Sequence, residues 1–174
     1  MKRLITLTAV MCSCFFSYAQ TREQDSLTVQ LSYEKQDSAK VETSIQLIKL
    51  LFDSNDYKKA LLYINRSEEL SANLNYHAAS AELKYYKALI YSQNDDYYNA
   101  LDNYNRSLRL YTQLNDSLGM AKVNNSLGLV EIRRGNYNKG LRHSLSAIDI
   151  FERKNLLDQL SLAYNNLALP GKYP

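Results

Sequence analysis

Apolar and small residues recur along most of the chain with a step of 40 residues. Tyr57, Tyr97 and Tyr137 each open a stretch in which such residues follow at spacings of three and four. That spacing places them on one face of an α-helix, and a second stripe of the same kind precedes each stretch. The pattern predicts helices at 38–53, 57–73, 77–93, 97–114, 117–133 and 137–154.

Short polar segments separate these helices. Asp56, Asp96 and Asn136 stand directly before three helix starts, where a side-chain oxygen can accept hydrogen bonds from the free amides of the first turn. Asparagine tolerates the left-handed conformation that commonly ends a helix. Residues of this type follow the second helices closely, at Asn75, Asn115 and Asn155. Turns this short predict antiparallel helix pairs.

Composition narrows the fold class. The chain of 174 residues contains only 5 Gly and 2 Pro, and the prolines are Pro170 and Pro174. So few turn-forming residues argue against an all-β sandwich or barrel, and the long stretch without proline favours helices. A hydrophobic content of 45% also argues against disorder.

The repeat resembles a known family at the residues of the third helix pair. Asn125-Ser126-Leu127-Gly128 is followed by Gly135-Asn136-Tyr137 and Leu141, an order similar to the signature of the tetratricopeptide repeat. The usual period of that family is about 34 residues, and the step of 40 resembles its long-period bacterial variant. The resemblance implies an all-α fold. Its expected architecture is a right-handed α-solenoid of antiparallel helix pairs, with three repeats plus the truncated first helix of a fourth.

The resemblance covers residues 38–169. We expect units at 38–76, 77–116 and 117–156, a partial unit at 157–169 and a tail at 170–174. Pro170 falls in mid-helix, where Val130 stands one step earlier, and proline cannot continue a helix there. Lys87 and Glu131 depart from the family pattern because their columns usually face inward. Either the two charges pair, or a long side chain reaches water from such a place.

In this family the first helix of each unit lines a concave groove, so the resemblance implies a partner-binding surface on those helices. A surface that mixes aromatic, aliphatic and polar groups suits a peptide or protein segment. The alternative is an ordinary solvated surface with scattered apolar groups. Residues 121–160 carry a net charge of +3, which favours an acidic partner segment. The expected groove residues are Lys49, Phe52, Tyr85, Leu89, Asn125, Leu129, Ile132 and Arg133.

The first nineteen residues have the three parts of a secretory signal peptide. Lys2 and Arg3 precede an apolar run over residues 4–16, and Ser17-Tyr18-Ala19 supplies the small residues before a cut. The run is too short to span a bilayer, which takes about 20 residues. We therefore expect export to the periplasm and no transmembrane helix in the mature chain. The alternatives are an N-terminal core helix, or a lipoprotein anchored through Cys14.

The polar segment 20–37 would begin the mature chain, as a short capping helix or a loose tail. Cys12 and Cys14 lie within the signal, so cutting after Ala19 removes thiolate chemistry. His77 and His143 lack the spacing of a helical metal site. A mature net charge of +1 gives little attraction for nucleic acid. We therefore expect no catalytic residues, no metal, no cofactor and no nucleic-acid partner.

Together these features predict an exported, non-enzymatic repeat module that binds a protein or peptide segment. Long-period repeats of this kind resemble the sensing part of bacterial regulators. The alternative is a structural scaffold protein that self-associates through the C-terminal end of its helix stack.

Overall fold

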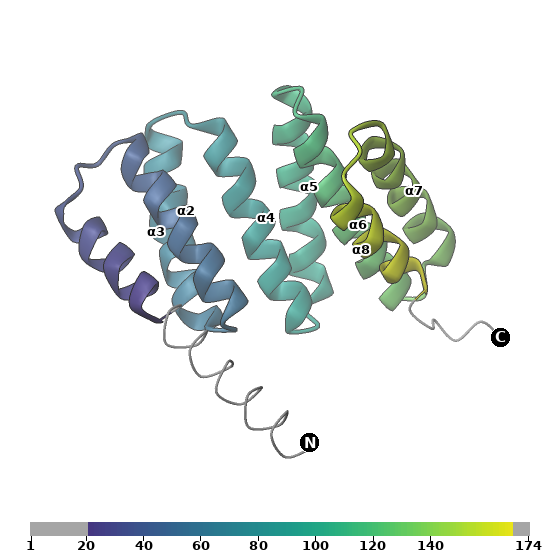
Figure 1. Cartoon of the computed structure of the whole chain (residues 1–174), viewed down its shortest axis with the longest axis horizontal. Coiled ribbons are helices and arrows are strands. Elements are labelled where there is room, and N and C mark those ends of the chain that lie inside the picture. Colours follow the sequence, from purple (N-terminus) through teal and green to yellow (C-terminus); the bar gives the residue numbers. More distant parts are fainter. Residues whose placement is uncertain (1–20, 169–174) are drawn as a thin grey trace, which may run out of the picture. The chain divides into compact units, whose positions relative to one another are not determined.

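The structure is a computed structural model, and it describes residues 21–168. All regular secondary structure within that range is α-helical (Figure 1). A helix over residues 21–33 comes first. The labelled helices that follow are α2 (Ser38–Asp53), α3 (Tyr57–Asn73), α4 (His77–Gln93), α5 (Tyr97–Gln113), α6 (Ser117–Arg133), α7 (Tyr137–Arg153) and α8 (Leu157–Ala168). These bounds confirm the predicted helices and the all-α fold class. The expected signal peptide, Cys14 and the tail at 170–174 lie outside the described residues.

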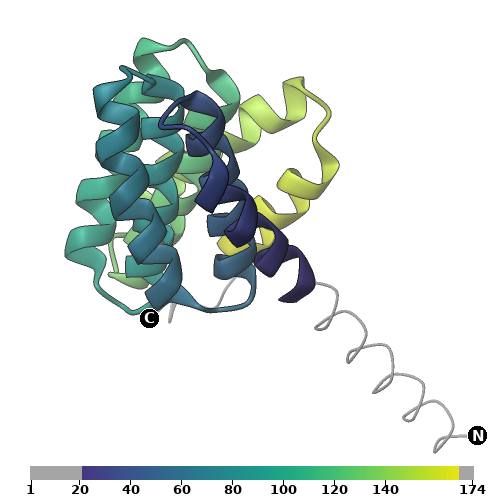
Figure 2. The same ribbon diagram turned by 90° about the vertical axis from the view of Figure 1, so that its left-hand side faces the viewer.

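The chain divides into two compact units, residues 1–70 and 71–174. In the N-terminal unit, the helix over residues 21–33 lies alongside α2 (Figures 1 and 2). Gln24 Nε2 donates to the carbonyl of Leu50 at 3.2 Å and to Ser54 Oγ at 3.0 Å. Leu31 is buried as well. The segment 20–37 therefore contains a packed helix over most of its length.

In the C-terminal unit the helices alternate in role: α4, α6 and α8 are first helices, and α5 and α7 are second helices. Each turn between them holds one residue at positive φ, namely Asp95 at 57°, Asn115 at 54°, Gly135 at 83° and Asn155 at 53°. The left-handed conformation predicted at Asn115 and Asn155 is confirmed. Asparagine, aspartate and glycine are the residues that adopt it at least cost, so the turns match the sequence at every step.

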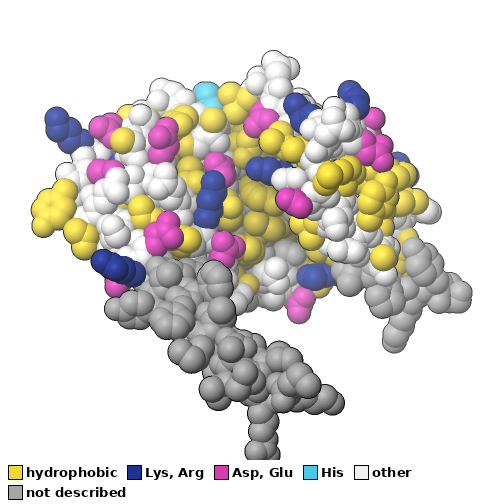
Figure 3. All heavy atoms as spheres, viewed as in Figure 1, with side chains coloured by type: hydrophobic (Ala, Val, Ile, Leu, Met, Phe, Trp, Pro, Cys, Tyr) yellow, Lys and Arg dark blue, Asp and Glu magenta, His cyan; other side chains and the backbone are white. Residues whose placement is uncertain are grey.

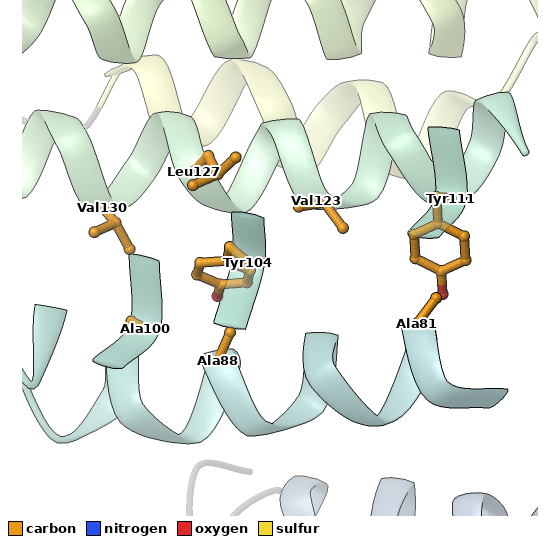
Figure 4. Close-up of a cluster of buried hydrophobic side chains, with 8 residues drawn as sticks. All are labelled: Ala81, Ala88, Ala100, Tyr104, Tyr111, Val123, Leu127 and Val130. Atoms are coloured by element: carbon orange, nitrogen blue, oxygen red, sulfur yellow. The ribbon is translucent and has the colours of Figure 1, made fainter. Parts of the chain in front are cut away.

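The core of the C-terminal unit is built from tyrosines that fill the space left by alanines. Figure 4 shows Tyr104 of α5 between Ala88 of α4 and Leu127 of α6. Tyr104 is 1% exposed and both of its neighbours are buried. A large residue against small ones lets three helices approach closely while leaving little empty volume. A second cluster, made of Ala121, Ala147, Ile148, Phe151 and Ala163, joins α6, α7 and α8.

The helices α6 and α7 cross at two glycines. A Cβ added at Gly140 would lie 2.6 Å from Ile132 Cγ1 and 2.8 Å from the carbonyl oxygen of Gly128. A Cβ at Gly128 would lie 3.0 Å from the carbonyl oxygen of Gly140. Gly140, where the repeat usually has alanine, is therefore required by the close approach of the two backbones.

Two of the three predicted helix caps are confirmed. Asp56 accepts from the amide of Lys59 at 3.2 Å, and Asp96 accepts from the amide of Asn99 at 3.2 Å. The prediction for Asn136 is wrong, because its side chain makes no cap bond to α7. Its amide nitrogen donates at 2.7 Å to Glu131, a buried carboxylate that needs donors.

Candidate functional site

The predicted groove residues of the N-terminal unit, Lys49 and Phe52, both lie half-buried on α2. The ring of Phe52 packs 5.6 Å from that of Tyr57, at the start of α3. These two residues belong to the N-terminal unit, and the other predicted groove residues belong to the C-terminal unit.

Tyr85 on α4 points from one first helix to the next. Its hydroxyl lies 3.4 Å from Ser126 Oγ on α6, and its ring lies 6.0 Å from that of Tyr104. Burial raises the pKa of the Tyr85 phenol above its usual value, more than the hydrogen bond to Ser126 lowers it. The phenol therefore stays neutral, and its hydrogen bond connects α4 to α6.

Asn125 on α6 makes the equivalent contact one repeat later, between α6 and α8. It is 6% exposed, and its side-chain oxygen accepts from Asn166 Nδ2 on α8 at 3.3 Å. Tyr85 and Ser126, like Asn125 and Asn166, are 41 residues apart, so both bonds use the same pair of columns in successive units. Two predicted groove residues thus hold neighbouring first helices together.

Ile132 also has a structural contact. Its side chain lies against Gly140 of α7, where a Cβ would come within 2.6 Å of it. Leu89 and Leu129 occupy one repeat column and are both half-buried, so part of each side chain reaches the surface. Figure 3 shows hydrophobic surface in a hollow over the part of the molecule where Figure 1 draws α4 and α5, bordered by charged side chains.

Arg133 ends α6 and is exposed. It interacts with the phenol of Tyr97, whose hydroxyl donates to Asp95 at 2.6 Å. That hydrogen bond to Asp95 raises the pKa of Tyr97, and the charge of Arg133 opposes the shift. The guanidinium of Arg133 therefore lies at the C-terminal end of α6 and is open to solvent. It acts on the same phenol as the carboxylate of Asp95.

A polar cluster lies between α6 and α7 around Glu131, whose inward-facing column the sequence predicted but whose partners it did not. Glu131 is 0% exposed, yet its carboxylate accepts from Asn136 at 2.7 Å, from Arg134 at 3.3 Å and from Lys139. These donors come from the turn after α6 and from α7, so the carboxylate does not depend on a partner from α4 such as Lys87. The signal for these partners in the sequence is the group of basic and amide residues within eight positions after Glu131.

The charges of this cluster set two pKa values. Burial alone would raise the pKa of Glu131, but the hydrogen bonds from Lys139 and Asn136 and the nearby positive charges outweigh it. The pKa lies below its ordinary 4.5. His143 Nδ1 lies 3.0 Å from Asn124 Oδ1, and burial followed by the charge of Lys139 lowers its pKa below 6.5. At neutral pH Glu131 is therefore ionised and His143 is neutral.

Within residues 21–168, no group of three or more His, Cys, Asp or Glu side chains could hold a metal ion. In the same range, no helix is both long enough and apolar enough to cross a membrane.

Comparisons with known proteins agree with this geometry. Residues 77–153, from the first residue of α4 to the last of α7, match the family model described as tetratricopeptide repeat. Among solved structures, the chain is similar to the crystal structure of BtubC (BKLC) from P. vanneervenii. The TM-score is 0.69 at 21% identity, over 87% of this chain and 63% of that one. The chain thus spans less than two thirds of that protein, and at this identity the likeness concerns the fold.

None of the curated proteins matches the sequence significantly. The matched region consists of two complete antiparallel helix pairs, α4–α5 and α6–α7. Their first helices are joined by the Tyr85–Ser126 hydrogen bond. The helix pairs α4–α5 and α6–α7 are therefore similar to tetratricopeptide repeats.

Proposed function

We propose that the chain is a non-enzymatic module that binds a protein or peptide segment along its first helices. One observation carries the proposal: Leu89 and Leu129 leave part of their apolar surface exposed in one repeat column, and the exposed Arg133 stands one turn beyond Leu129. A few apolar anchors beside a charged group are typical of a surface that recognises a segment of another protein.

The chemistry of this surface favours an acidic segment. A carboxylate can bind the guanidinium of Arg133 in two-point geometry while an adjacent apolar side chain contacts Leu129. Tyr85, Asn125 and Ile132 support the surface from below, since each is engaged with a neighbouring helix. In the N-terminal unit, Lys49 and Phe52 of α2 are proposed separately as partner-binding residues.

The N-terminal sequence supports a place of action. A basic start, an apolar run and a small-residue cut site would direct the chain out of the cytoplasm. An exported repeat module of this kind would sense or hold a partner in the periplasm, as part of a regulator. A structural scaffold built by self-association is the second candidate, and it depends on a different surface.

The binding proposal is tested by affinity capture from the exported protein fraction with wild type and two variants. Leu129→Glu with Arg133→Glu changes the proposed surface, whereas Arg109→Glu reverses an exposed charge on the second helix α5. We expect the double variant to lose the captured proteins and Arg109→Glu to keep them. Recovery of the same proteins by all three would overturn the assignment, provided circular dichroism shows that each variant is folded.

A further inference from the structure

The second helices α5 and α7 each pack against the following first helix through one buried ring in their last turn. In α5 the ring belongs to Tyr111, which is 9% exposed and fills the space beside Gly119 of α6. In α7 it belongs to Phe151, which is 1% exposed and packs with Ala163 of α8. We call the contact between a second helix and the next first helix a seam. The seams α5–α6 and α7–α8 are therefore closed by an aromatic side chain.

The same column in the last turn of α3 carries Ser71, which is completely buried but small. Its hydroxyl lies 3.0 Å from that of Ser80 on α4. The column of Ser80 carries Met120 in α6 and Leu160 in α8, and both pack against the hydrophobic clusters of their seams. Two serines therefore stand where the next two seams have an aromatic and an aliphatic side chain. A neutral hydrogen bond contributes less to stability than the burial of large apolar side chains.

The start of α4 also lacks the cap that the equivalent helix α6 has. Before α6, the side chain of Asp116 accepts from the amide of Gly119 at 3.0 Å. Tyr76 occupies the equivalent position before α4, and its side chain makes no cap bond to the helix. A side-chain cap satisfies one of the four free amides at a helix start. The first turn of α4 is therefore held less firmly than the first turn of α6.

A third observation concerns the same place in the chain. The division into two compact units falls between residues 70 and 71, directly before Ser71. We propose that the turn over residues 74–76 is a joint at which the helices before it open without those after it. The helices α2 and α3 then unfold locally while α5, α6 and α7 remain folded. The small serine pair, the missing cap and the division of the chain all support this position for the joint.

The repeat architecture makes one weak contact consequential. In a repeat protein each unit contacts only its neighbours, so stability is a sum of the units and of the contacts between them. A weak contact at one place therefore divides the unfolding of the chain at that place. Segments of low local stability are the ones that move when a protein changes conformation. The proposal does not depend on partner binding by the first helices, so either can fail alone.

Hydrogen exchange of the full chain at increasing urea concentrations, followed by mass spectrometry, tests the joint. Each peptide reports how often its own helix opens. We expect a single step at residues 74–76, with the amides of α2 and α3 exchanging about tenfold faster than those of α5 and α6. A smooth gradient from α2 to α7, a step at another turn, or one common rate for all helices would overturn the proposal.

Two substitutions in the α5–α6 seam test the cause. Tyr111→Ser introduces the residue that α3 carries, and Asp116→Ala removes the kind of cap that α4 lacks. We expect the double variant to gain a second step after α5, and the control Arg109→Ala, at an exposed position of α5, to keep the wild-type profile. Faster exchange spread evenly over α5, α6 and α7 would overturn the explanation. If circular dichroism shows that the double variant does not fold, Asp116→Ala alone should speed exchange in the first turn of α6, and unchanged exchange there would equally overturn it.

Discussion

The buried carboxylate of Glu131 makes the most specific stability prediction. Replacing Glu131 with Gln keeps the volume of the side chain but removes its charge. The amide of Gln also presents a donor to Lys139 and Asn136, which are donors themselves. We expect the free energy of unfolding at about pH 7 to fall by about 3 kcal/mol, the lower end for breaking a buried ion pair. The lower end applies because Lys139 and Arg134 remain 54% and 40% exposed and can return to water.

Two further variants separate the contributions. Lys139→Met removes one charged hydrogen bond to the buried carboxylate and should cost about 2 kcal/mol. Lys154→Met is the control, since Lys154 is an exposed lysine that follows α7. It should change the free energy of unfolding by less than about 0.5 kcal/mol. Urea denaturation followed by far-UV circular dichroism measures all three.

The sign of the pH dependence follows from the lowered pKa of Glu131. The unfolded chain takes up a proton near the ordinary value of 4.5, before the folded chain does, so acid favours unfolding. The stabilising contribution of Glu131 is present above that value and is lost as the pH falls through the lower folded pKa. Glu131→Gln should therefore lose less stability than wild type between about pH 7 and about pH 3. Equal stability of Glu131→Gln and wild type at both pH values would refute the reasoning.

Three other variants test the core and the turns by the same denaturation assay. Gly140→Ala should cost about 1–3 kcal/mol, because its Cβ would meet Ile132 and the backbone of Gly128. Gly135→Asn should be nearly neutral, since asparagine adopts the same positive φ at Asn115 and Asn155. A large loss in Gly135→Asn, or none in Gly140→Ala, would contradict this account. Tyr104→Ala should cost about 3–5 kcal/mol as the loss of a fully buried aromatic ring, and a smaller loss would mean that the cluster repacks. His143→Gln should weaken the decline of stability from about pH 7 to about pH 5. The folded state holds His143 neutral below its ordinary 6.5, so in wild type acid favours unfolding over this window. An unchanged pH profile in His143→Gln would count against the pKa direction.

The helices and turns could be predicted because they depend on local pattern. Tyr97 and Tyr137 begin helices where the apolar stripe begins, and Asn115 and Asn155 adopt the left-handed conformation that asparagine tolerates. Asp96 caps α5 for the same local reason. Spacing along one helix carries this information without knowledge of any neighbour.

The contacts between helices could not be predicted in the same way. Asn136 resembles Asp96 in position, but the buried Glu131 one turn earlier takes its side-chain amide. Tyr85 and Asn125 occupy groove columns, yet their polar groups bond to the next first helix. The hydrogen-bond partner of each side chain depends on which residue of the neighbouring helix faces it. The 40-residue repeat predicts which positions are equivalent, but it does not predict the side-chain rotamer at each position.

The central claim is that the surface of the first helices around Leu129 binds another protein. Its most direct test places a photo-crosslinking amino acid at position 129 and, as a control, at position 109 on α5, in the full-length chain expressed in cells. The account predicts that position 129 gives a discrete crosslinked protein and that position 109 does not. The crosslink should weaken when Arg133→Glu is added. Crosslinks of equal yield at both positions, or none at position 129, would contradict it.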